Sequence, residues 1–520
     1  MYYKPNRHVD LPSTDLLTWI FGNEACHEPD RPLYIDALDP TRRLTFSQAR
    51  SAIRSMIKGL RSLGIKRGSC VCLHTFNIYY PLLFLAVIGA GGVFVGSNPG
   101  YKELELTSLL ETSKASLIIT APDLLPTVQN VTHQLQISDS RVLVFGEACD
   151  TPNGFRSWNE LFQHGEDDWV RFDNEKTAKE TPACLVTTSG TTGMPKMAVL
   201  SHHAWVALNC VIDDPDPKPY EIKRLIFLPM FHTFAAPLSH LAPLREGHTT
   251  YIMPRFSMSQ FINAVERFDI TEVLLVPPMI VSFVTSTTPR NFLKHIRFVW
   301  CGGAPLEGAV VQQMYRLLAP DACIAQVYGM TEAGWISTLK WPERDESGSV
   351  GRLLPNVEAK LINEHGVFVR EPGKRGEICV RGPRLMTGYL GNPKASADSF
   401  IDGWLKTGDV GTIDKLGRIF IVDRQKDLIK VRGWQVAPAE LEGVLRTHPH
   451  IIDAAVIGVK YNNSEAPKAF VVRDCHSLSE EAVKAYIATL LVGYKHLDGG
   501  VCFVDSIPKS PSGKILRKLL

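Results

Sequence analysis

The ten residues 187–196, TTSGTTGMPK, combine small hydroxyl side chains with two glycines and one lysine. Glycine lets successive backbone N–H groups converge on an anion, and the hydroxyl groups and the lysine supply further hydrogen bonds and a positive charge. These are the groups needed to hold a polyphosphate. Taken alone, the same residues are also typical of a polar surface turn, so other stretches of the chain must decide between the two interpretations.

The spacing in this loop argues against a P-loop NTPase. A Walker A loop needs four residues between its glycines and a Ser or Thr directly after its lysine. Here Gly190 and Gly193 are separated by two residues, and Lys196 is followed by Met197.

A second stretch, 326–332 (QVYGMTE), ends in a hydroxyl beside a carboxylate. Thr331 can donate to a phosphate oxygen. Glu332 can bind Mg²⁺, which usually takes only one or two protein carboxylates together with phosphate oxygens. On its own the pattern is that of a turn at a strand end with a surface glutamate.

Two further stretches carry single chemical groups. In 404–409 (WLKTGD), Asp409 follows a glycine turn, where a carboxylate can accept hydrogen bonds from both hydroxyls of a ribose. In 508–514 (PKSPSGK), a loop that is first rigid and then flexible presents Lys514. Taken singly, Asp409 is a turn residue and Lys514 is a solvated surface lysine.

In this order and spacing, the four stretches resemble those of the adenylate-forming superfamily, which contains acyl-CoA synthetases, adenylation domains and beetle luciferases. Chance agreement of four long motifs in order is very improbable, and the resemblance covers roughly residues 30–520. Within the superfamily the chain is most similar to 4-coumarate:CoA ligase-like enzymes. That likeness rests on PMFH (229–232), YGMTEAG (328–334), IVDR (421–424), QVAPAEL (435–441) and residues 508–518.

The resemblance implies an AMP-forming acid–CoA ligase that uses ATP, Mg²⁺ and coenzyme A. Such an enzyme joins a carboxylic acid to AMP with release of pyrophosphate, and then passes the acyl group to the thiol of coenzyme A. Preorganised donors and Mg²⁺ stabilise the charge on the α-phosphate and on the departing pyrophosphate. The implied partners are therefore a small carboxylic acid and coenzyme A.

The matching motif positions imply roles in the first half-reaction. Lys514 is expected to reach the carboxylate and the α-phosphate, Glu332 to bind the metal, and Gly303, Ala304, Pro305 and Tyr328 to form the slot for adenine. The ATP- or AMP-binding residues implied in this way are Thr188, Ser189, Gly190, Thr191, Thr192, Gly193, Lys196, Gly303, Ala304, Pro305, Tyr328, Gly329, Thr331, Asp409 and Arg424.

The resemblance also implies a second half-reaction, for which a small C-terminal domain rotates and withdraws Lys514. Lys426 matches the hinge of that rotation, and Gly433 matches a glycine that lines the pantetheine tunnel. Lys430 and Gln435 match residues that act in thioester formation.

His232 is grouped with these catalytic positions because it borders the acid site by resemblance. A lone histidine in an apolar stretch is nevertheless more often a core or gate residue. Two other places depart from the family pattern. Met197 replaces a usual glycine and is expected to stiffen the phosphate loop, and the usual Gly-Glu pair is missing near Ser464–Pro467.

The acid pocket is expected to be apolar. Its aromatic residues offer no charged partner, and no Asp lies near Ala235 to bind an ammonium group. We therefore expect an aryl-propenoic or a medium-chain aliphatic acid rather than an amino acid. Several of the pocket positions can equally be ordinary core; they are Phe231, Phe234, Leu238, Met330, Trp335 and Ile336.

Length and composition limit the number of domains and the kinds of partner that the protein can have. A chain of 520 residues is too long for one core, so at least two domains are expected. The net charge of +2 gives no indication of a nucleic-acid partner or an anionic-membrane surface. Eleven cysteines without CxxC pairs are typical of reduced thiols. We expect a monomer or weak homodimer.

No targeting or membrane-spanning segment is predicted. The apolar stretch Tyr79–Val95 opens at Pro81 and is interrupted by glycines, which favours a buried helix, a turn and a strand. The N-terminus lacks the pattern of a signal peptide, and the C-terminal residues 517–520 (RKLL) are not a peroxisomal Ser-Lys-Leu signal. A cytoplasmic location is expected, and a peroxisomal one stays open if a C-terminal signal was trimmed.

The elements that must position these residues alternate between helices and strands. Residues 48–63 have helical apolar spacing, and Ser201 is placed to cap a helix that begins at His202. Such alternation favours a parallel sheet with helices on its faces. The strands expected in this part are 70–73, 117–120, 142–145, 183–186, 225–228, 273–276 and 297–300.

Beyond Gly351 the pattern changes to strands separated by glycine turns, and the charged residues 423–427 then mark a domain boundary. The expected fold class is α/β, with a large N-terminal domain of parallel α/β subdomains plus a small β subdomain, and a small mobile α+β C-terminal domain. The expected bounds are 1–423 for the N-terminal domain, 424–426 for the hinge and 427–520 for the C-terminal domain.

Three other functions stay open. The adenylate can be passed to the phosphopantetheine of a carrier protein, or oxidised as in luciferases. A non-enzymatic nucleotide- or acyl-binding relic is disfavoured because every expected polar position is filled.

Overall fold

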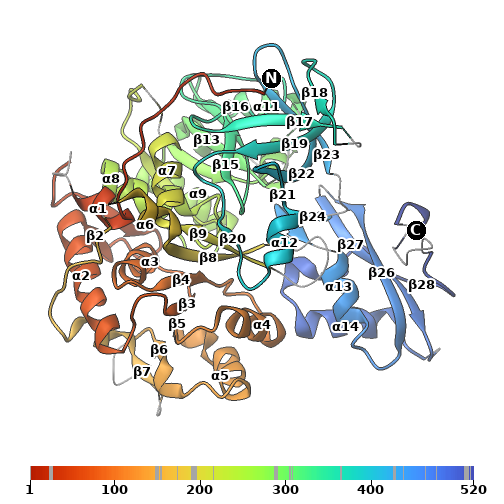
Figure 1. Cartoon of the computed structure of the whole chain (residues 1–520), viewed down its shortest axis with the longest axis horizontal. Coiled ribbons are helices and arrows are strands. Elements are labelled where there is room, and N and C mark those ends of the chain that lie inside the picture. Colours follow the sequence, from red (N-terminus) through yellow and green to blue (C-terminus); the bar gives the residue numbers. More distant parts are fainter. Residues whose placement is uncertain are drawn as a thin grey trace.

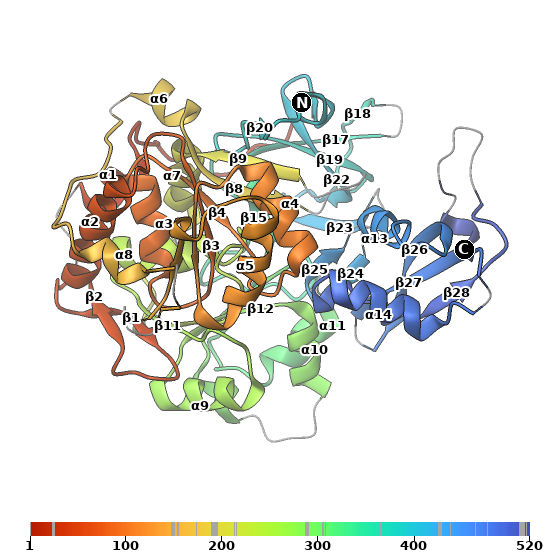
Figure 2. The same cartoon turned by 90° about the horizontal axis from the view of Figure 1, so that it is seen from below.

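The computed structural model of the chain consists of a large α/β part, a β subdomain and a smaller C-terminal unit that lies to one side (Figures 1 and 2). The expected fold class is confirmed. The structure describes residues 2–22, 27–146, 151–152, 155–172, 174–188, 196–212, 214, 216–285, 291–303, 306, 308–363, 366–424, 429–436, 438–462, 464–475, 477–508, 515 and 517–520.

The first large sheet has the order β20-β9-β8-β4-β3-β5-β6-β7, and its strands from β8 to β7 are parallel. Parallel sheets are covered on both faces, so their strands are apolar throughout. In β3, Val71 and Leu73 pack into the core on one face while Cys72 packs on the other. The strands are β3 (Cys70–His74), β4 (Val93–Gly96), β5 (Leu117–Thr120), β6 (Val142–Val144), β7 (Arg156–Ser157), β8 (Pro182–Thr188), β9 (Lys196–Ser201) and β20 (Gly388–Tyr389).

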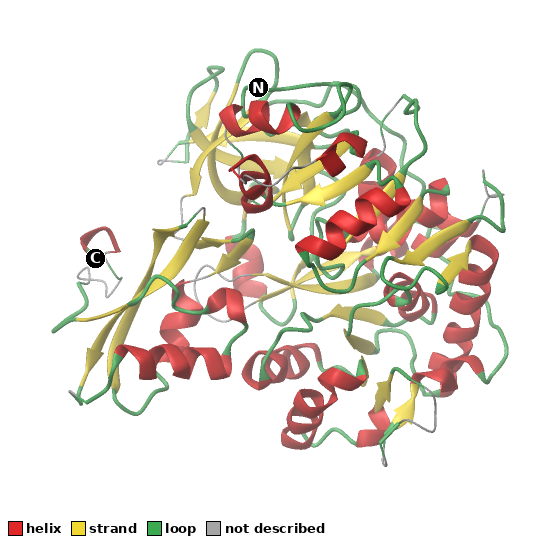
Figure 3. Cartoon of the chain, turned by 180° about the vertical axis from the view of Figure 1, so that it is seen from behind, coloured by secondary structure: helices red, strands yellow, loops and turns green. Residues whose placement is uncertain are grey.

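Helices cover both faces of this sheet (Figure 3). Helix α2 begins where a capping box forms, since Thr45 accepts from the Gln48 N–H and Gln48 accepts from the Thr45 N–H. Ser201 accepts from the Ala204 N–H, which confirms it as the cap of the helix that begins at His202. The helices are α2 (Phe46–Ser62), α3 (Tyr80–Gly89), α4 (Glu103–Ser113), α5 (Leu125–Gln134), α6 (Glu175–Glu180) and α7 (His202–Ile212), with α1 (Leu16–Phe21) packed beside α7.

The second large sheet has the order β16-β15-β14-β13-β12-β10-β11-β1-β2 and is parallel from β14 to β1. Its strands are β1 (Pro32–Asp36), β2 (Arg43–Thr45), β10 (Lys223–Ile226), β11 (Thr249–Ile252), β12 (Glu272–Leu275), β13 (Phe298–Gly302), β14 (Cys323–Met330), β15 (Gly334–Thr338) and β16 (Arg352–Leu353). The helical segments between them are η5 (Pro237–Leu241), α8 (Ala242–Glu246), α9 (Met258–Phe268), α10 (Pro277–Thr285) and α11 (Gly308–Tyr315).

The antiparallel β subdomain has the order β18-β17-β19-β22-β21, with β23 added beside β22. Its β20 neighbour reaches across to the first sheet, where it pairs with β9. The subdomain elements are β17 (Glu358–Ile362), β18 (Phe368–Val369), β19 (Gly376–Arg381), α12 (Pro393–Asp398), β21 (Phe400–Ile401), β22 (Trp404–Ile413) and β23 (Ile419–Arg424).

The C-terminal unit has a hydrophobic core of its own, formed by residues from Ile429 to Leu497. It opens with the short hairpin β24 (Ile429–Val431) and β25 (Trp434–Val436), which points toward the large part. The rest consists of α13 (Pro438–Leu445), β26 (Ile451–Tyr461), β27 (Ser464–Arg473), α14 (Glu480–Leu490), the turn η7 (Gly493–Lys495) and β28 (Val501–Phe503), with η8 (Arg517–Leu519) close to the C-terminus.

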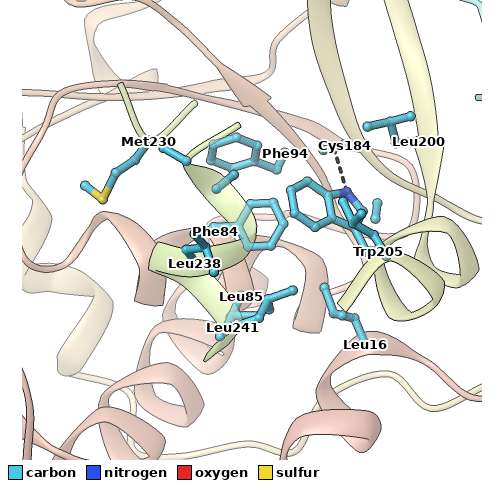
Figure 4. Packing of buried hydrophobic residues seen from close by; sticks show 14 of the residues in the cluster. Leu16, Phe84, Leu85, Phe94, Cys184, Leu200, Trp205, Met230, Leu238 and Leu241 are labelled. Atoms are coloured by element: carbon cyan, nitrogen blue, oxygen red, sulfur yellow. Dashed lines mark hydrogen bonds between the residues drawn. The ribbon is translucent and has the colours of Figure 1, made fainter. Parts of the chain in front are cut away.

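The central core joins the two large sheets. Figure 4 shows aromatic and aliphatic side chains from α3, α7 and η5 in contact, with the Trp205 indole N–H donating to Cys184 Sγ. The cysteines that the structure describes are free thiols. Among the described residues, no helix combines the length and apolar character needed to cross a membrane, and Tyr79–Val95 forms α3 and β4 as expected.

Candidate active site

A cleft of about 250 Å³ lies where the two large sheets, the β subdomain and the C-terminal unit meet. Strand ends of the large part supply one wall, at the carboxyl ends of β8 and β14. Residues 407–409 of β22 supply a second wall, and the tip of the β24–β25 hairpin supplies a third. In open α/β sheets, ligands bind at the carboxyl ends of strands, so this is where a substrate is expected.

Asp409 is held rigidly at one side of the cleft. The Tyr328 hydroxyl donates to Asp409 Oδ2 at 3.0 Å, and the Asp409 N–H donates to the Thr407 hydroxyl at 3.1 Å. Asp409 is 4% exposed. A buried carboxylate fixed in this way is preorganised to accept hydrogen bonds from a ribose. Tyr328 and Asp409, 81 residues apart, are thus brought together.

Glu332 lies in the same cleft beside the start of β9. The Tyr389 hydroxyl donates to Glu332 Oε1 at 2.7 Å, and the Lys196 ammonium lies 4.9 Å from the centre of the Tyr389 ring. Burial and the neighbouring carboxylate raise the pKa of Tyr389 above its ordinary range. Tyr389 therefore stays protonated and donates its hydroxyl hydrogen to Glu332.

The donor set around Glu332 fits Mg²⁺ bound mainly by phosphate. Within the described part of the chain, no cluster of three or more His, Cys, Asp or Glu side chains is placed to hold a metal. One buried carboxylate with Thr331 next to it suits a cation that takes most of its ligands from phosphate and water.

Two glycine positions in the cleft allow neighbouring backbone segments to approach closely. Gly303 follows β13 with a φ of +94°, and a Cβ there would lie 3.1 Å from the Gly433 carbonyl oxygen. A Cβ at Gly329 would lie 2.4 Å from the Gly334 carbonyl oxygen, so the β14–β15 hairpin closes only with glycine. Gln326 fixes the backbone after Gly303, because its side chain exchanges hydrogen bonds with the N–H and carbonyl of Leu306.

His232 faces the cleft with a defined tautomer. Its Nδ1 accepts from the Phe234 N–H at 3.2 Å, so a neutral ring carries its proton on Nε2. The side chain is open to the cleft, but the walls around it remove bulk water and lower the pKa of His232 to about 4. At neutral pH His232 is thus a neutral hydrogen-bond donor into the cleft.

Aromatic side chains form the apolar end of the cleft. The Phe234 and Trp335 rings lie 5.8 Å apart, and the Trp335 indole N–H donates to the Thr233 carbonyl. Phe231, Phe234, Met330 and Trp335 line the cavity as expected.

Leu238 and Ile336 differ from the expectation, since neither lines the cavity. Leu238 is 2% exposed on η5 and packs near Leu241, as Figure 4 shows, and Ile336 is 1% exposed in the same core. Alternation along β15 explains the second case, because Trp335 faces the cleft and its neighbour must face away.

The β24–β25 hairpin places its tip against the large part. Gly433 has a φ of +86°, and a Cβ there would lie 2.9 Å from Val276 Cγ1. The Trp434 ring stacks 6.2 Å from Phe231 and lies 6.4 Å from His232. The Lys430 side chain lines the cleft.

The hairpin is braced by the region where a family motif was missing. Glu465 Oε2 accepts from the Lys430 N–H at 2.7 Å, and Ser464 Oγ donates to the Lys430 carbonyl at 2.9 Å. The loop that departs from the pattern is therefore an ordered start of β27.

Comparisons with known proteins identify the family. A model described as AMP-binding enzyme matches residues 21–390, and one described as AMP-binding enzyme C-terminal domain matches residues 440–514. The chain belongs to the AMP-binding enzyme family. A phenylacetyl-CoA ligase from Aspergillus niger is 43% identical over 100% of this chain and 98% of its own length. A nicotinic acid-CoA ligase from Aspergillus fumigatus is 36% identical over 98% of this chain and 96% of its own length.

A solved relative has the same overall arrangement. The amide bond synthetase McbA from Marinactinospora thermotolerans aligns with a TM-score of 0.83 and 27% identity, covering 97% of this chain and 98% of that one.

Several residues expected at the site of this AMP-binding enzyme lie outside the described residues. The expected phosphate loop leaves β8 at Thr188, which lines the cleft, and returns at Lys196, which pairs with Thr188. The Met197 side chain is 3% exposed and packs in a cluster with α4 and α5, so it is anchored in the core directly after the return strand begins. The residues outside the description are Ser189, Gly190, Thr191, Thr192, Gly193, Ala304, Pro305, Lys426 and Lys514, together with the side chains of Arg424 and Gln435.

Other cleft residues were missed by the sequence analysis. Tyr389, Thr407 and Gln326 act on neighbouring polar groups, and Glu440 and Lys495 line the cleft from the C-terminal unit. Gln326, Thr407 and Glu440 lie within motifs named above, but their types alone indicate no role there. Tyr389 and Lys495 lie outside those motifs, and their partners Glu332 and Glu105 are 57 and 390 residues away in sequence. The one sequence signal for Lys495 is a lysine placed among the mainly apolar residues 491–497.

Proposed function

We propose that this protein is an AMP-forming acid–CoA ligase that activates a small aromatic carboxylic acid. The observation that carries the proposal is the meeting of three groups of residues in one cleft. Asp409, Thr331 and Glu332 suit a nucleotide with its metal, Phe234 and Trp335 suit an apolar acid, and the Gly433 hairpin closes the same space.

In the first half-reaction, Asp409 accepts from the ribose hydroxyls, and Tyr328 holds that carboxylate in place. Glu332 and Thr331 bind at the phosphates, where Mg²⁺ supplies charge neutralisation when it is present. The role of Lys514 as the cation between carboxylate and α-phosphate rests on the family resemblance.

In the second half-reaction, the thiol sulfur of coenzyme A attacks the acyl carbon of the adenylate. A carbon–sulfur bond forms, the carbon–oxygen bond to AMP breaks, AMP leaves with the electron pair, and the thiol proton passes to solvent. The adenylate is already activated, so the protein chiefly positions the thiol and excludes water. The close approach of Gly303 and Gly433 supports a narrow passage for the pantetheine arm.

The aromatic walls favour a flat acid over a long chain. Phe231, Phe234 and Trp335 surround the apolar end, and the His232 Nε2–H is the polar donor that faces it. Relatives described as phenylacetyl-CoA and nicotinic acid-CoA ligases support an aromatic acid of one ring.

A panel of acids tests the proposal. The full-length protein is incubated with Mg²⁺ and ATP and with phenylacetic, nicotinic, 4-coumaric or octanoic acid, each with and without coenzyme A. Pyrophosphate and thioester are measured. We expect a thioester only with coenzyme A, and the highest kcat/KM with a single-ring aromatic acid.

Other outcomes have defined meanings. Preference for octanoic acid would contradict the aromatic assignment. Adenylate without transfer to coenzyme A would favour another acceptor, such as a carrier-protein thiol. The absence of any product that depends on Mg²⁺ and ATP would contradict adenylation altogether.

A further inference from the structure

A buried charge cluster joins the C-terminal unit to the large part, and we define it as Glu105, Glu440 and Lys495. The Lys495 ammonium lies 2.8 Å from Glu105 Oε1 and 2.8 Å from Glu440 Oε1. The three side chains are 4–6% exposed. Glu105 belongs to α4 of the large part, whereas Glu440 and Lys495 belong to the C-terminal unit, so the cluster crosses the interface.

Glu105 makes a second contact across the same interface. Its Oε2 accepts from the Val492 N–H at 2.8 Å and also from the Lys102 N–H at 3.2 Å at the start of its own helix. Nearby, a Cβ at Gly100 would lie only 2.8 Å from Val492 Cγ2. One carboxylate therefore receives two donors from the C-terminal unit at a point of close backbone approach.

The cluster is connected to the hairpin at the acid site through η7. Tyr494, next to Lys495, stacks on Trp434 with ring centres 4.3 Å apart and planes 6° apart. Trp434 in turn faces Phe231 and His232, and Gly433 meets Gly303. Lys495 is thus connected to the hairpin tip through the stacked pair of Tyr494 and Trp434.

The ion pair between Glu105 and Lys495 forms only when the C-terminal unit has the orientation seen in this structure. The two carboxylates hold the pKa of the Lys495 ammonium well above its ordinary range despite burial, so the cluster has one cation shared by two anions. If the C-terminal unit turned away, Glu105 would lose Lys495 and Val492 while Glu440 kept Lys495. Removing one member of a buried ion pair is costly because the remaining charge is uncompensated.

We propose that Glu105 is a positioning residue for thioester formation, which latches the C-terminal unit in the orientation that brings the β24–β25 hairpin to the acid site. The inference rests on the proposed two-step function and adds a residue to its second step. Glu105 acts through Lys495 and Val492, and adenylation does not require it.

The first test measures the two half-reactions separately in Glu105→Gln. Adenylation is followed as acid-dependent exchange between ATP and pyrophosphate, and thioester formation is followed from supplied acyl-adenylate and coenzyme A. We expect thioester formation to fall by about 10- to 100-fold while exchange changes by less than about twofold. Equal losses in both half-reactions, or no loss in the second, would overturn the proposal.

Glu103→Gln is the matched control. Glu103 lies on the same helix, but its Oε1 accepts from Asn130 at 2.7 Å within the large part. It has the same charge and the same substitution without the interface contact. We expect both half-reactions to stay at the level of the unaltered protein.

Val492→Pro tests the latch from the other side of the interface. Val492 has φ −66° and ψ 151°, which proline adopts, and Leu491 before it has φ −126° and ψ 155°, which a residue before proline adopts. The substitution removes the N–H that donates to Glu105. The same selective loss of thioester formation is expected, and an unchanged rate would count against the latch.

Hydrogen exchange tests the orientation without any substrate. In the full-length protein, amide exchange in residues 429–436 should rise in Glu105→Gln and Val492→Pro and stay unchanged in Glu103→Gln. Unchanged exchange in the first two variants would overturn the latch. An unaltered protein that makes no thioester with any acid would contradict the proposed function instead, and exchange would still decide whether the latch exists.

Discussion

At the scale of single residues, polar groups in the cleft are held by partners far away in sequence. Asp409 is fixed by Tyr328 and Thr407, Glu332 by Tyr389, and His232 by the Phe234 N–H. Each partner restricts the rotation of the group before substrate binds, so this conformational entropy is not lost at the binding step. The cleft is therefore preorganised, which is the usual source of electrostatic stabilisation in enzymes.

Asp409→Asn tests the assignment of the ribose acceptor. Hydrogen bonds to a charged acceptor contribute about 1.5–3 kcal/mol, so we expect the KM for ATP to rise by about 10- to 100-fold. Steady-state kinetics at saturating acid and coenzyme A measure it. A KM for ATP equal to that of the unaltered protein would remove Asp409 from the nucleotide site.

Phe234→Leu tests the acid pocket. A smaller side chain facing Trp335 should raise the ratio of kcat/KM for 4-coumaric acid to that for phenylacetic acid by about 3- to 10-fold, because pocket size discriminates modestly between apolar groups. Leu238→Val is the control. Leu238 is buried away from the cavity, so the variant should lose stability and keep the ratio. A change of ratio in Leu238→Val would return that residue to the pocket.

At the scale of elements, the β24–β25 hairpin contributes to the cleft, whereas the strand β12 contributes to the stability of the sheet. The hairpin delivers Gly433 to the cleft, and Ser464 and Glu465 fix its base. Strand β12 begins with Glu272, which is fully buried between Lys218 and Arg224. The first arrangement serves the site, and the second holds the sheet beneath it.

Gly433→Ala should impair thioester formation selectively. The glycine has a positive φ, and a Cβ would press on Val276 at 2.9 Å, so the hairpin tip must shift. We expect thioester formation from supplied acyl-adenylate to fall by about tenfold or more while adenylation is retained. Lys514→Ala should show the opposite pattern, with adenylation abolished and thioester formation spared. Equal losses in both half-reactions of either variant would contradict a two-orientation mechanism.

Glu272→Gln should destabilise the large part strongly. It leaves Lys218 and Arg224 buried with their shared anion removed, which typically costs about 3–5 kcal/mol. Asp398→Asn is the control, since its pair with Lys394 is exposed and such pairs contribute about 0–1 kcal/mol. Urea unfolding measures both. A cost for Glu272→Gln as small as that of the control would contradict the buried network.

At the scale of the whole molecule, the C-terminal unit has a core of its own and meets the large part through a buried ion pair and the aromatic hairpin tip. Among the residues that the structure describes, its apolar cluster draws only on the C-terminal unit, whereas its interface holds the Glu105–Lys495 pair and the hairpin tip. An interface of this kind can be broken and remade without unfolding either core, as domain rotation requires.

We expect the protein to lose stability as the pH falls below about 6.5, which is above the pH at which ordinary carboxylates become protonated. Burial lowers the pKa of His74 to about 4 and that of His202 and His240 to about 3. The unfolded state, with histidine pKa values near 6.5, binds more protons in this window, so stability is full above about pH 6.5 and falls as the pH decreases toward 4.

Urea unfolding at several values of pH between 7.5 and 5 checks the sign. His202→Gln should flatten the pH dependence, since an amide oxygen can still accept from the Leu16 N–H that now donates to His202. A slope identical to that of the unaltered protein would exclude His202 as a source.

Much of the fold could be predicted from periodicity. The strands β5 and β12 and the helix α2 lie within two residues of their expected bounds, because each buries a continuous or helical set of apolar side chains. Leu238 and Ile336 were assigned to the wrong surroundings. Their sequence neighbours line the cleft, and periodicity cannot tell which apolar face meets a cavity and which meets the core.

The sequence by itself determined the class of chemistry, since motifs with residues such as Thr331, Glu332 and Asp409, each ordinary alone, occur together in one order. Only the tertiary structure decided how those groups are held and how the C-terminal unit is docked. Tyr389 meets Glu332 across 57 residues, and Lys495 meets Glu105 across 390. Local patterns report local backbone preference, whereas a buried charge finds its partner through the packing of the whole chain.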